Sequence, residues 1–135
     1  MDAEPLLNLY KKIKDLSHID NQCTHPNVEA DIASSFYCIM ALGTLCKLRA
    51  NNILYKLECL CQSEYFKTKG DEKEKKFGDF ILDILNIFKS KDFDFYNFFG
   101  NKQSSHCIND KTRGWYGHAF KLVLYYLLNY EKYNR

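Results

Sequence analysis

The sequence predicts an all-α fold, a single compact bundle of five to six helices that forms one domain over residues 1–135. Three observations lead to this prediction. Apolar residues recur at spacings of three and four, as they do along the buried face of a helix. No segment alternates apolar and polar residues as a strand does, and Val28 and Val123 are the only valines. The chain of 135 residues can bury one core and contains no Pro- or Gly-rich linker.

The first two helices are each marked by a proline. Pro5 suits the first position of a helix, where its missing N–H leaves no hydrogen bond unmade. The following helix is expected to end near His18, with an apolar face made of Leu6, Leu9, Ile13 and Leu16. Pro26 opens the second helix, whose broad apolar stripe consists of Val28, Ile32, Phe36, Ile39, Met40, Leu42, Leu45 and Cys46. Gly43 lies inside this stripe and predicts the close approach of a neighbouring helix.

The middle of the chain continues the helical pattern after a break predicted at residues 50–52. A third helix then carries an apolar face of Ile53, Leu54, Leu57, Leu60 and Cys61 and ends near Tyr65. Residues 67–76 mix lysine with acidic side chains, so they are expected to form a solvated loop, the end of which starts the fourth helix. The apolar face of that helix is Phe77, Phe80, Ile81, Ile84, Leu85 and Phe88.

The C-terminal part of the chain is predicted to hold one short and one long helical segment. The short segment, 93–99, is rich in aromatic residues, and Gly100 is expected to end it as a left-handed cap. A polar, turn-rich stretch follows. The last helix is expected from about Thr112 to Tyr130. Its apolar face consists of Trp115, Ala119, Leu122, Tyr126 and Tyr130, extended by Phe120, Val123, Leu127 and Leu128.

Charge and hydropathy restrict the possible partners. The net charge is only +2 and the basic residues are not concentrated on one face, so no nucleic-acid partner is expected. No run of 18 apolar residues and no secretory signal occur, which predicts no membrane span and a cytoplasmic location; a fragment of a secreted or cell-surface protein stays an alternative. Abundant Lys, Asn, Ile, Phe and Tyr, all encoded by AT-rich codons, indicate a parasite or large-DNA-virus genome.

The six cysteines are expected to be reduced thiols packed as small apolar side chains, with disulfides as the alternative. Cys38 and Cys46 are predicted to be buried on one helix and unbonded, because eight residues of helix separate them by about 12 Å. Cys59 and Cys61 point about 200° apart on a helix, so they do not share a metal. No metal site and no cofactor are therefore predicted.

No catalytic pattern stands out, and the chain is expected not to be an enzyme. The one nucleophilic arrangement worth naming is Cys107 in a loop with His118 on the last helix, since a thiolate beside an imidazole can act as a nucleophile. Asn109 or Asp110 could orient that imidazole. A small cysteine-dependent enzyme that uses Cys107 and His118 is thus an alternative function.

The aromatic segment carries the main functional prediction, a non-enzymatic protein–protein interaction module. Its partner would be another protein or a second copy of the chain. Aromatic side chains bury a large area with few torsions to freeze, so they dominate many binding surfaces. An aromatic plug that fills the core is the alternative interpretation of the same residues. The predicted partner-binding residues are Phe93, Phe95, Tyr96, Phe98, Phe99 and Trp115.

Three short stretches resemble the homology motifs of the Bcl-2 family. The stretch from Ile108 to Gly114-Trp115 is similar to the second motif, Phe77-Gly78 to the first, and Ile39 to Gly43 to the start of the third. The resemblance implies an all-helical protein that binds an amphipathic helix in a groove, which is the second alternative function. Asp79 stands where the first motif carries an arginine that pairs with the ligand helix.

Overall fold

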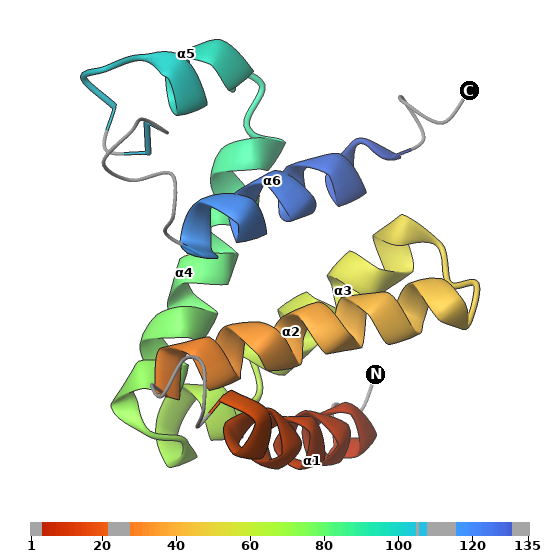
Figure 1. The fold of residues 1–135 in the computed structure, drawn as a ribbon. Coiled ribbons are helices and arrows are strands. Elements are labelled where there is room, and N and C mark those ends of the chain that lie inside the picture. The colour runs from red at the N-terminus through yellow and green to blue at the C-terminus, as the bar shows by residue number, and fades with distance from the viewer. Residues whose placement is uncertain (1–3, 22–27, 105, 108–115, 131–135) are drawn as a thin grey trace. The chain divides into compact units, whose positions relative to one another are not determined.

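The computed structural model describes residues 4–21, 28–104, 106–107 and 116–130 (Figure 1). Within these residues the chain forms six α-helices and one π-helix and no strand, which confirms the all-α prediction. None of the described helices is long and apolar enough to cross a membrane. The elements are α1 (Glu4–Asn21), α2 (Val28–Leu45), α3 (Ala50–Cys61), η1 (Tyr65–Lys69), α4 (Glu72–Lys89), α5 (Phe95–Gly100) and α6 (Tyr116–Leu128).

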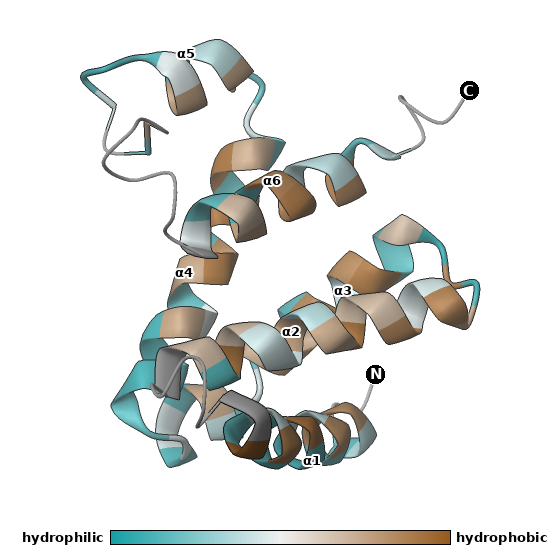
Figure 2. Ribbon diagram, in the orientation of Figure 1, coloured by the Kyte–Doolittle hydropathy of each residue, from teal (hydrophilic) through white to brown (hydrophobic). Residues whose placement is uncertain are grey.

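The chain divides into two compact units, Met1–Leu82 and Asp83–Arg135, and the boundary lies inside α4. The single domain over 1–135 stays a prediction. Apolar and polar residues alternate along α2 and α4, as the brown and teal segments of Figure 2 show. This alternation at helical spacing is the pattern that predicts the helices from the sequence.

Unit 1 is built on a pair of antiparallel helices, α1 and α2, with α3 packed against both. Its core is aromatic. The Tyr10 ring lies 5.6 Å from that of Phe36 and 5.0 Å from that of Phe66, and the rings of Phe36 and Phe77 are 5.2 Å apart. These contacts join α1, α2, η1 and α4, so the core of unit 1 depends on residues that are far apart in the sequence.

The buried face of α1 differs from the predicted one. Tyr10 is fully buried, whereas Leu9 and Leu16 are exposed. The helix is turned so that the larger tyrosine, which also has a polar partner, takes the place in the core. The helix also continues to Asn21, three residues beyond the predicted end.

The outcome for α2 is mixed. Ile32, Phe36 and Ile39 are buried as predicted, but Cys38 and Cys46 are exposed free thiols, so their predicted burial is wrong. The helix also ends earlier than predicted, at Leu45, and residues 50–52 are the first turn of α3 rather than a break. The turn falls at Lys47, which has a left-handed backbone with φ of 61°.

The charged stretch 67–76 is not simply a solvated loop. Its beginning continues a π-helix, η1, and its end is the first turn of α4. Glu74 within it is buried, and Asp71 caps α4, since the Asp71 carboxylate accepts from the Glu74 N–H at 2.9 Å and the Glu74 carboxylate accepts from the Asp71 N–H at 3.3 Å. This is a reciprocal capping box, which explains why the helix starts there.

Unit 2 contains the end of α4, α5 and α6. Phe88 lies at the centre of an aromatic cluster, with ring centroids 5.0 Å from Phe93, 5.4 Å from Phe98 and 5.7 Å from Tyr125. Gly100 is the last residue of α5 and has no positive φ, so the predicted left-handed cap is wrong. The predicted face of α6 is only partly right: Phe120 is buried as predicted, whereas Ala119, Tyr126 and Tyr130 are exposed. Lys121 and Leu124 are buried although the prediction did not include them.

Candidate functional site

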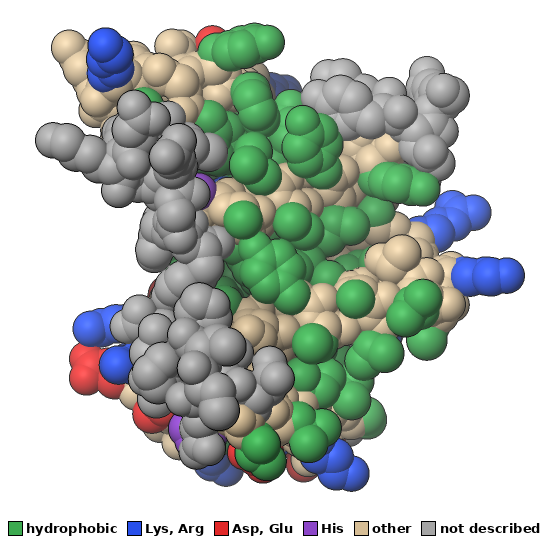
Figure 3. Space-filling view, in the orientation of Figure 1, with side chains coloured by type: hydrophobic (Ala, Val, Ile, Leu, Met, Phe, Trp, Pro, Cys, Tyr) green, Lys and Arg blue, Asp and Glu red, His purple; other side chains and the backbone are tan. Residues whose placement is uncertain are grey.

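An open apolar groove of about 280 Å³ lies in unit 1 between α1, the end of α2 and α3. Figure 3 shows hydrophobic side chains gathered over α1 and the end of α2. The lining contains one charged residue, Lys56, and is otherwise apolar: Pro5, Leu6, Leu9, Ile39, Leu42, Gly43, Cys46, Leu48 and Ile53. A groove of this composition can bury apolar side chains of a ligand but offers few groups for polar chemistry.

The floor of the groove forms because α2 and α3 approach closely at Gly43. A Cβ atom on Gly43 would lie 2.9 Å from Cγ1 of Ile53, so only glycine fits there without a shift. The close approach predicted from this mid-helix glycine is therefore confirmed. Ile39 and Ile53 are buried beside it.

The rim of the groove is held by the turn between α2 and α3. The Lys47 N–H donates to the carbonyl of Thr44 and the Leu48 N–H to that of Gly43, both at 3.0 Å. With the left-handed Lys47 this is a Schellman-type helix end, which folds Leu48 back over the helix. Leu48 thus becomes part of the lining while more than a third of it stays exposed.

Several exposed charged residues adjoin the groove lining. Lys47 and Arg49 are exposed on either side of Leu48 in the turn. On α1, exposed Lys12 shares a face with Leu9 and Leu16, since these residues are spaced by three and four. The exposed acidic residues of this part of α1 are Glu4, next to Pro5, and Asp15, next to Leu16. Together with Lys56 in the lining, the charges next to the groove residues are therefore mainly positive.

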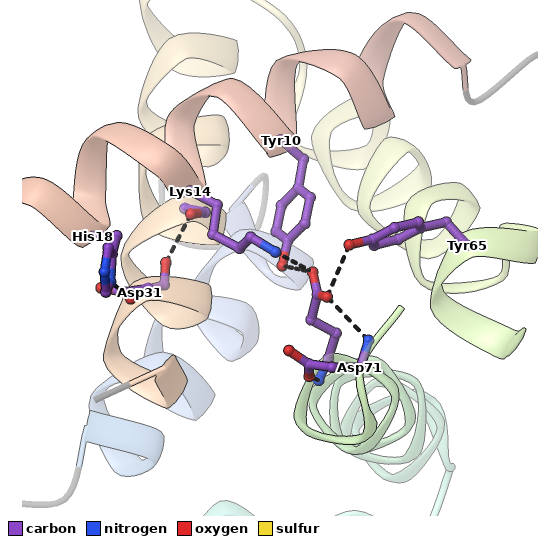
Figure 4. Close-up of polar contacts among 8 residues, drawn as sticks. Tyr10, Lys14, His18, Asp31, Tyr65 and Asp71 are labelled. Carbon is purple, nitrogen blue, oxygen red and sulfur yellow. Dashed lines mark hydrogen bonds and ion pairs between the residues drawn. The ribbon is translucent and has the colours of Figure 1, made fainter. Parts of the chain in front are cut away.

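A buried carboxylate, Glu74, holds α1 in place as one wall of the groove. The side chains of Tyr10, Lys14 and Tyr65 converge on it (Figure 4). Its oxygens accept from the Tyr10 hydroxyl at 2.7 Å, the Tyr65 hydroxyl at 2.9 Å and Lys14 Nζ at 3.0 Å. Burial and the bond to Glu74 both raise the pKa of Tyr10. Every polar atom of this buried group is paired, as a stable interior requires.

At the other end of the α1–α2 pair, His18 Nδ1 lies 2.8 Å from the Asp31 carboxylate. Asp31 is buried, and its main-chain carbonyl also accepts from the Ser35 hydroxyl at 2.7 Å. Together with Glu74 this contact fixes α1 against its neighbours at two points along its length. The helix that forms one wall of the groove is thus held by polar contacts as well as by apolar packing.

The predicted aromatic residues divide into buried and exposed positions. Phe99 is buried, Phe93, Phe95 and Phe98 are half-buried, and Tyr96 is 80% exposed. Trp115 lies outside the described residues. Phe93, Phe98 and Phe99 thus lie together around Phe88, as in the alternative interpretation of an aromatic plug. Tyr96 lies on the surface.

Cys107 and His118 are both buried in unit 2. Beside them is a basic pair, in which Lys121 Nζ lies 2.9 Å from His106 Nδ1 and the His106 ring stacks on Phe98 at 4.3 Å. Burial lowers the pKa of Lys121 to about 8. Burial, followed by the charge of Lys121, lowers the pKa of His106. The cysteine-dependent enzyme stays an alternative, and neither Cys107 nor His118 lines the groove of unit 1.

The residues behind the Bcl-2 resemblance have different surroundings. Ile39 and Gly43 line the groove. Gly78 packs against Phe66, where an added Cβ would lie 3.2 Å from the ring, and Asp79 pairs with Lys67 at 3.6 Å. Residues 108–115 lie outside the described part of the chain. The resemblance therefore stays a hypothesis.

Sequence reasoning did not find the groove as a site. Two signals for it were present, Gly43 inside an apolar stripe and a stripe on α2 too broad for one neighbour.

Among the described residues, no three His, Cys, Asp or Glu side chains are placed to hold a metal ion. The chain matches no protein-family model, and it has no significant match among curated proteins or solved structures.

Proposed function

We propose that this chain is a non-enzymatic protein–protein interaction module that binds its partner in the groove of unit 1. The observation that carries the proposal is an apolar groove whose rim residues Leu9, Leu42 and Leu48 are each more than a third exposed. Apolar surface removed from water contributes about 25 cal/mol per Å². A partner that covers these leucines therefore gains binding free energy, which is why clustered exposed apolar residues mark interaction sites.

The proposed partner is another protein, and a second copy of the chain is the alternative. We place the module in the cytoplasm, because exposed thiols such as Cys38 and Cys46 stay reduced there. An exposed thiol beside an apolar groove would be prone to oxidation in a secreted protein.

A second candidate surface for the same function is α5 in unit 2. Tyr96 is exposed there, and a shallow depression of about 400 Å³ next to it is lined in part by Phe93, Asn97 and Phe98. Exposed tyrosine is common at binding hot spots. This surface offers less apolar area than the groove, because Phe99 is already buried in unit 2.

Photo-crosslinking in the source cell tests the proposal. A photoreactive residue replaces Leu45, which is 76% exposed and close in sequence to the groove-lining Leu42 and Cys46, or Tyr96, or the exposed Lys75 as a control. A protein attached through position 45 but not through position 75 is the expected result. The captured protein is then purified, and Leu42→Lys is expected to weaken its binding at least tenfold without unfolding the chain.

Other outcomes of the crosslinking experiment lead to different conclusions. A protein captured only through position 96 would move the binding surface to α5. Capture through neither position, with the chain folded and expressed, would contradict the interaction function itself.

A further inference from the structure

We infer that the groove of unit 1 takes an amphipathic helix of another protein, and that the flanks of this helix carry Asp or Glu. The inference rests on the proposed function and adds the chemistry of the partner. Two observations support it, the direction of the apolar surface around the groove and the sign of the charge on its rim.

The apolar surface runs along the α1–α2 pair in both directions. The two helices are antiparallel, because His18 late in α1 contacts Asp31 early in α2, whereas Leu9 and Leu42 meet in the groove. Exposed Leu16 extends the apolar face of α1 towards one end, and exposed Leu45 extends that of α2 towards the other. An elongated apolar seam between two helices is the surface that a third helix covers in a bundle. A docking helix would reach it with anchors spaced three, four and seven residues apart.

The charge on the rim selects the flanks of that helix. Lys12, Lys47 and Arg49 are exposed around the leucines of the groove. Acidic side chains beside the apolar anchors would meet these residues with favourable electrostatics, which raises the association rate and sets the orientation of the helix. A second copy that docked through the Leu9 face of α1 would instead bring its own Lys12 towards a basic rim.

A displayed library of amphipathic helical peptides, with fixed leucine anchors and randomised flanks, tests the inference on the full chain. We expect the selected flanks to be enriched in Asp and Glu, and binding to weaken as salt rises. Lys47→Glu with Arg49→Glu should weaken the selected peptides about three- to tenfold, the effect of exposed charge pairs. Lys75→Glu with Lys76→Glu, exposed lysines of α4, changes the net charge equally and should leave binding unchanged.

Alkylation of cysteine locates the bound peptide. Cys46 lines the groove and is exposed, just after the end of α2. A peptide in the groove should slow the alkylation of Cys46, and it should have no such effect in the Leu42→Lys variant, which is expected not to bind the peptide. Unchanged alkylation of Cys46 in a chain that binds the peptide would contradict the groove as the binding site.

The remaining outcomes separate this inference from the proposed function. Flanks without acidic bias, or with basic bias, would overturn the partner chemistry and leave the interaction function standing. No enrichment over the Leu42→Lys variant would overturn helix binding, while crosslinking through position 45 would still report a protein partner of another kind. Concentration-dependent protection of Cys46 without peptide, together with a dimer in sedimentation, would assign the groove to a second copy.

Discussion

At the scale of single residues, Glu74 is a buried polar link within unit 1. It is almost completely buried, and it joins three segments: α1 through Tyr10 and Lys14, η1 through Tyr65, and the start of α4 through the Asp71 N–H. A buried carboxylate is stable only when such donors replace water. If the carboxylate is removed, the Tyr10 hydroxyl loses its acceptor and cannot bond to water instead, because Tyr10 has no access to solvent.

Glu74→Ala is expected to reduce the free energy of unfolding by about 3–5 kcal/mol, since it leaves the buried Tyr10 hydroxyl and the Lys14 ammonium without their acceptor. Urea denaturation measures the loss. Glu72→Ala is the matched control two residues earlier; its carboxylate pairs with Lys76 at 3.8 Å on the surface, so a change below about 0.5 kcal/mol is expected. Equal effects of the two variants would refute the buried role of Glu74.

Lys121 is a buried lysine of unit 2. Burial lowers its pKa to about 8, below the usual 10.5 of lysine. Below pH 8 the ammonium is charged in both states, and the folded state carries the full cost of burying it. Between pH 8 and 10.5 the folded chain has a neutral amine while the unfolded chain still binds the proton, so the contribution of Lys121 becomes less unfavourable as pH rises.

Lys121→Met is therefore expected to raise the free energy of unfolding at pH 7, and this gain over the original chain should shrink between pH 8 and 10.5. Denaturation of both chains across this pH range measures the gain. Tyrosine titration affects both chains alike, so it largely cancels in the difference between their free energies of unfolding. A difference that stays constant with pH would mean that the amine keeps its ordinary pKa.

At the scale of elements, the contact between α2 and α3 decides the shape of the groove. It depends on Gly43, where the backbone of α2 meets Ile53. Helices approach this closely only where one of them lacks a side chain, and the approach offsets the roughly 1 kcal/mol that a mid-helix glycine costs. The Schellman-type end at Lys47 then returns the chain directly into α3.

Gly43→Ala is expected to destabilise the chain by about 1–3 kcal/mol, because the new methyl group would overlap Ile53. Gly100→Ala is the control glycine: nothing lies within 4 Å of its Cβ position and its φ is not positive, so the change should be neutral or stabilising. Thermal or urea denaturation distinguishes the two. A stabilising Gly43→Ala would show that α2 and α3 do not touch there.

At the scale of the whole molecule, two units share one continuous helix, α4. The sequence predicts one domain. The shared helix favours cooperative unfolding of the two units, because the two halves of α4 belong to different units and are joined in one continuous helix. The aromatic cluster of unit 2 offers a way to perturb one unit alone.

Phe99→Ala is expected to cost about 3–5 kcal/mol, since Phe99 is buried against Phe88, Phe95 and Phe98. Tyr96→Ala is the control in the same helix: Tyr96 is exposed, so its removal should change the free energy of unfolding little. Hydrogen exchange of the full chain is then followed across urea concentrations, with α3 reporting the unfolding of unit 1 and α6 that of unit 2. If the chain is a single domain, Phe99→Ala should lower the urea midpoints of α3 and α6 together. A midpoint that falls only for α6 would indicate two domains.

Much of the helical architecture follows from local sequence. The apolar spacing predicts the buried faces of α3 and α4 almost residue for residue, and Gly43 predicts the close helix contact. The faces of α1, α2 and α6 are less well predicted. In α1 the periodicity cannot tell whether Leu9 or Tyr10 is buried, because both lie near the edge of the same stripe and the choice depends on Glu74, sixty-four residues away.

The sequence by itself determined the fold class, most helix positions and a net charge of only +2. These properties follow from periodicity and composition, which act within a few residues. Only the tertiary structure decided which apolar residues remain outside. Leu9 and Leu42 belong to the predicted buried faces of their helices, but the antiparallel packing of α1 and α2 over Gly43 leaves them beside an open groove, because exposure depends on neighbours that the local pattern does not specify.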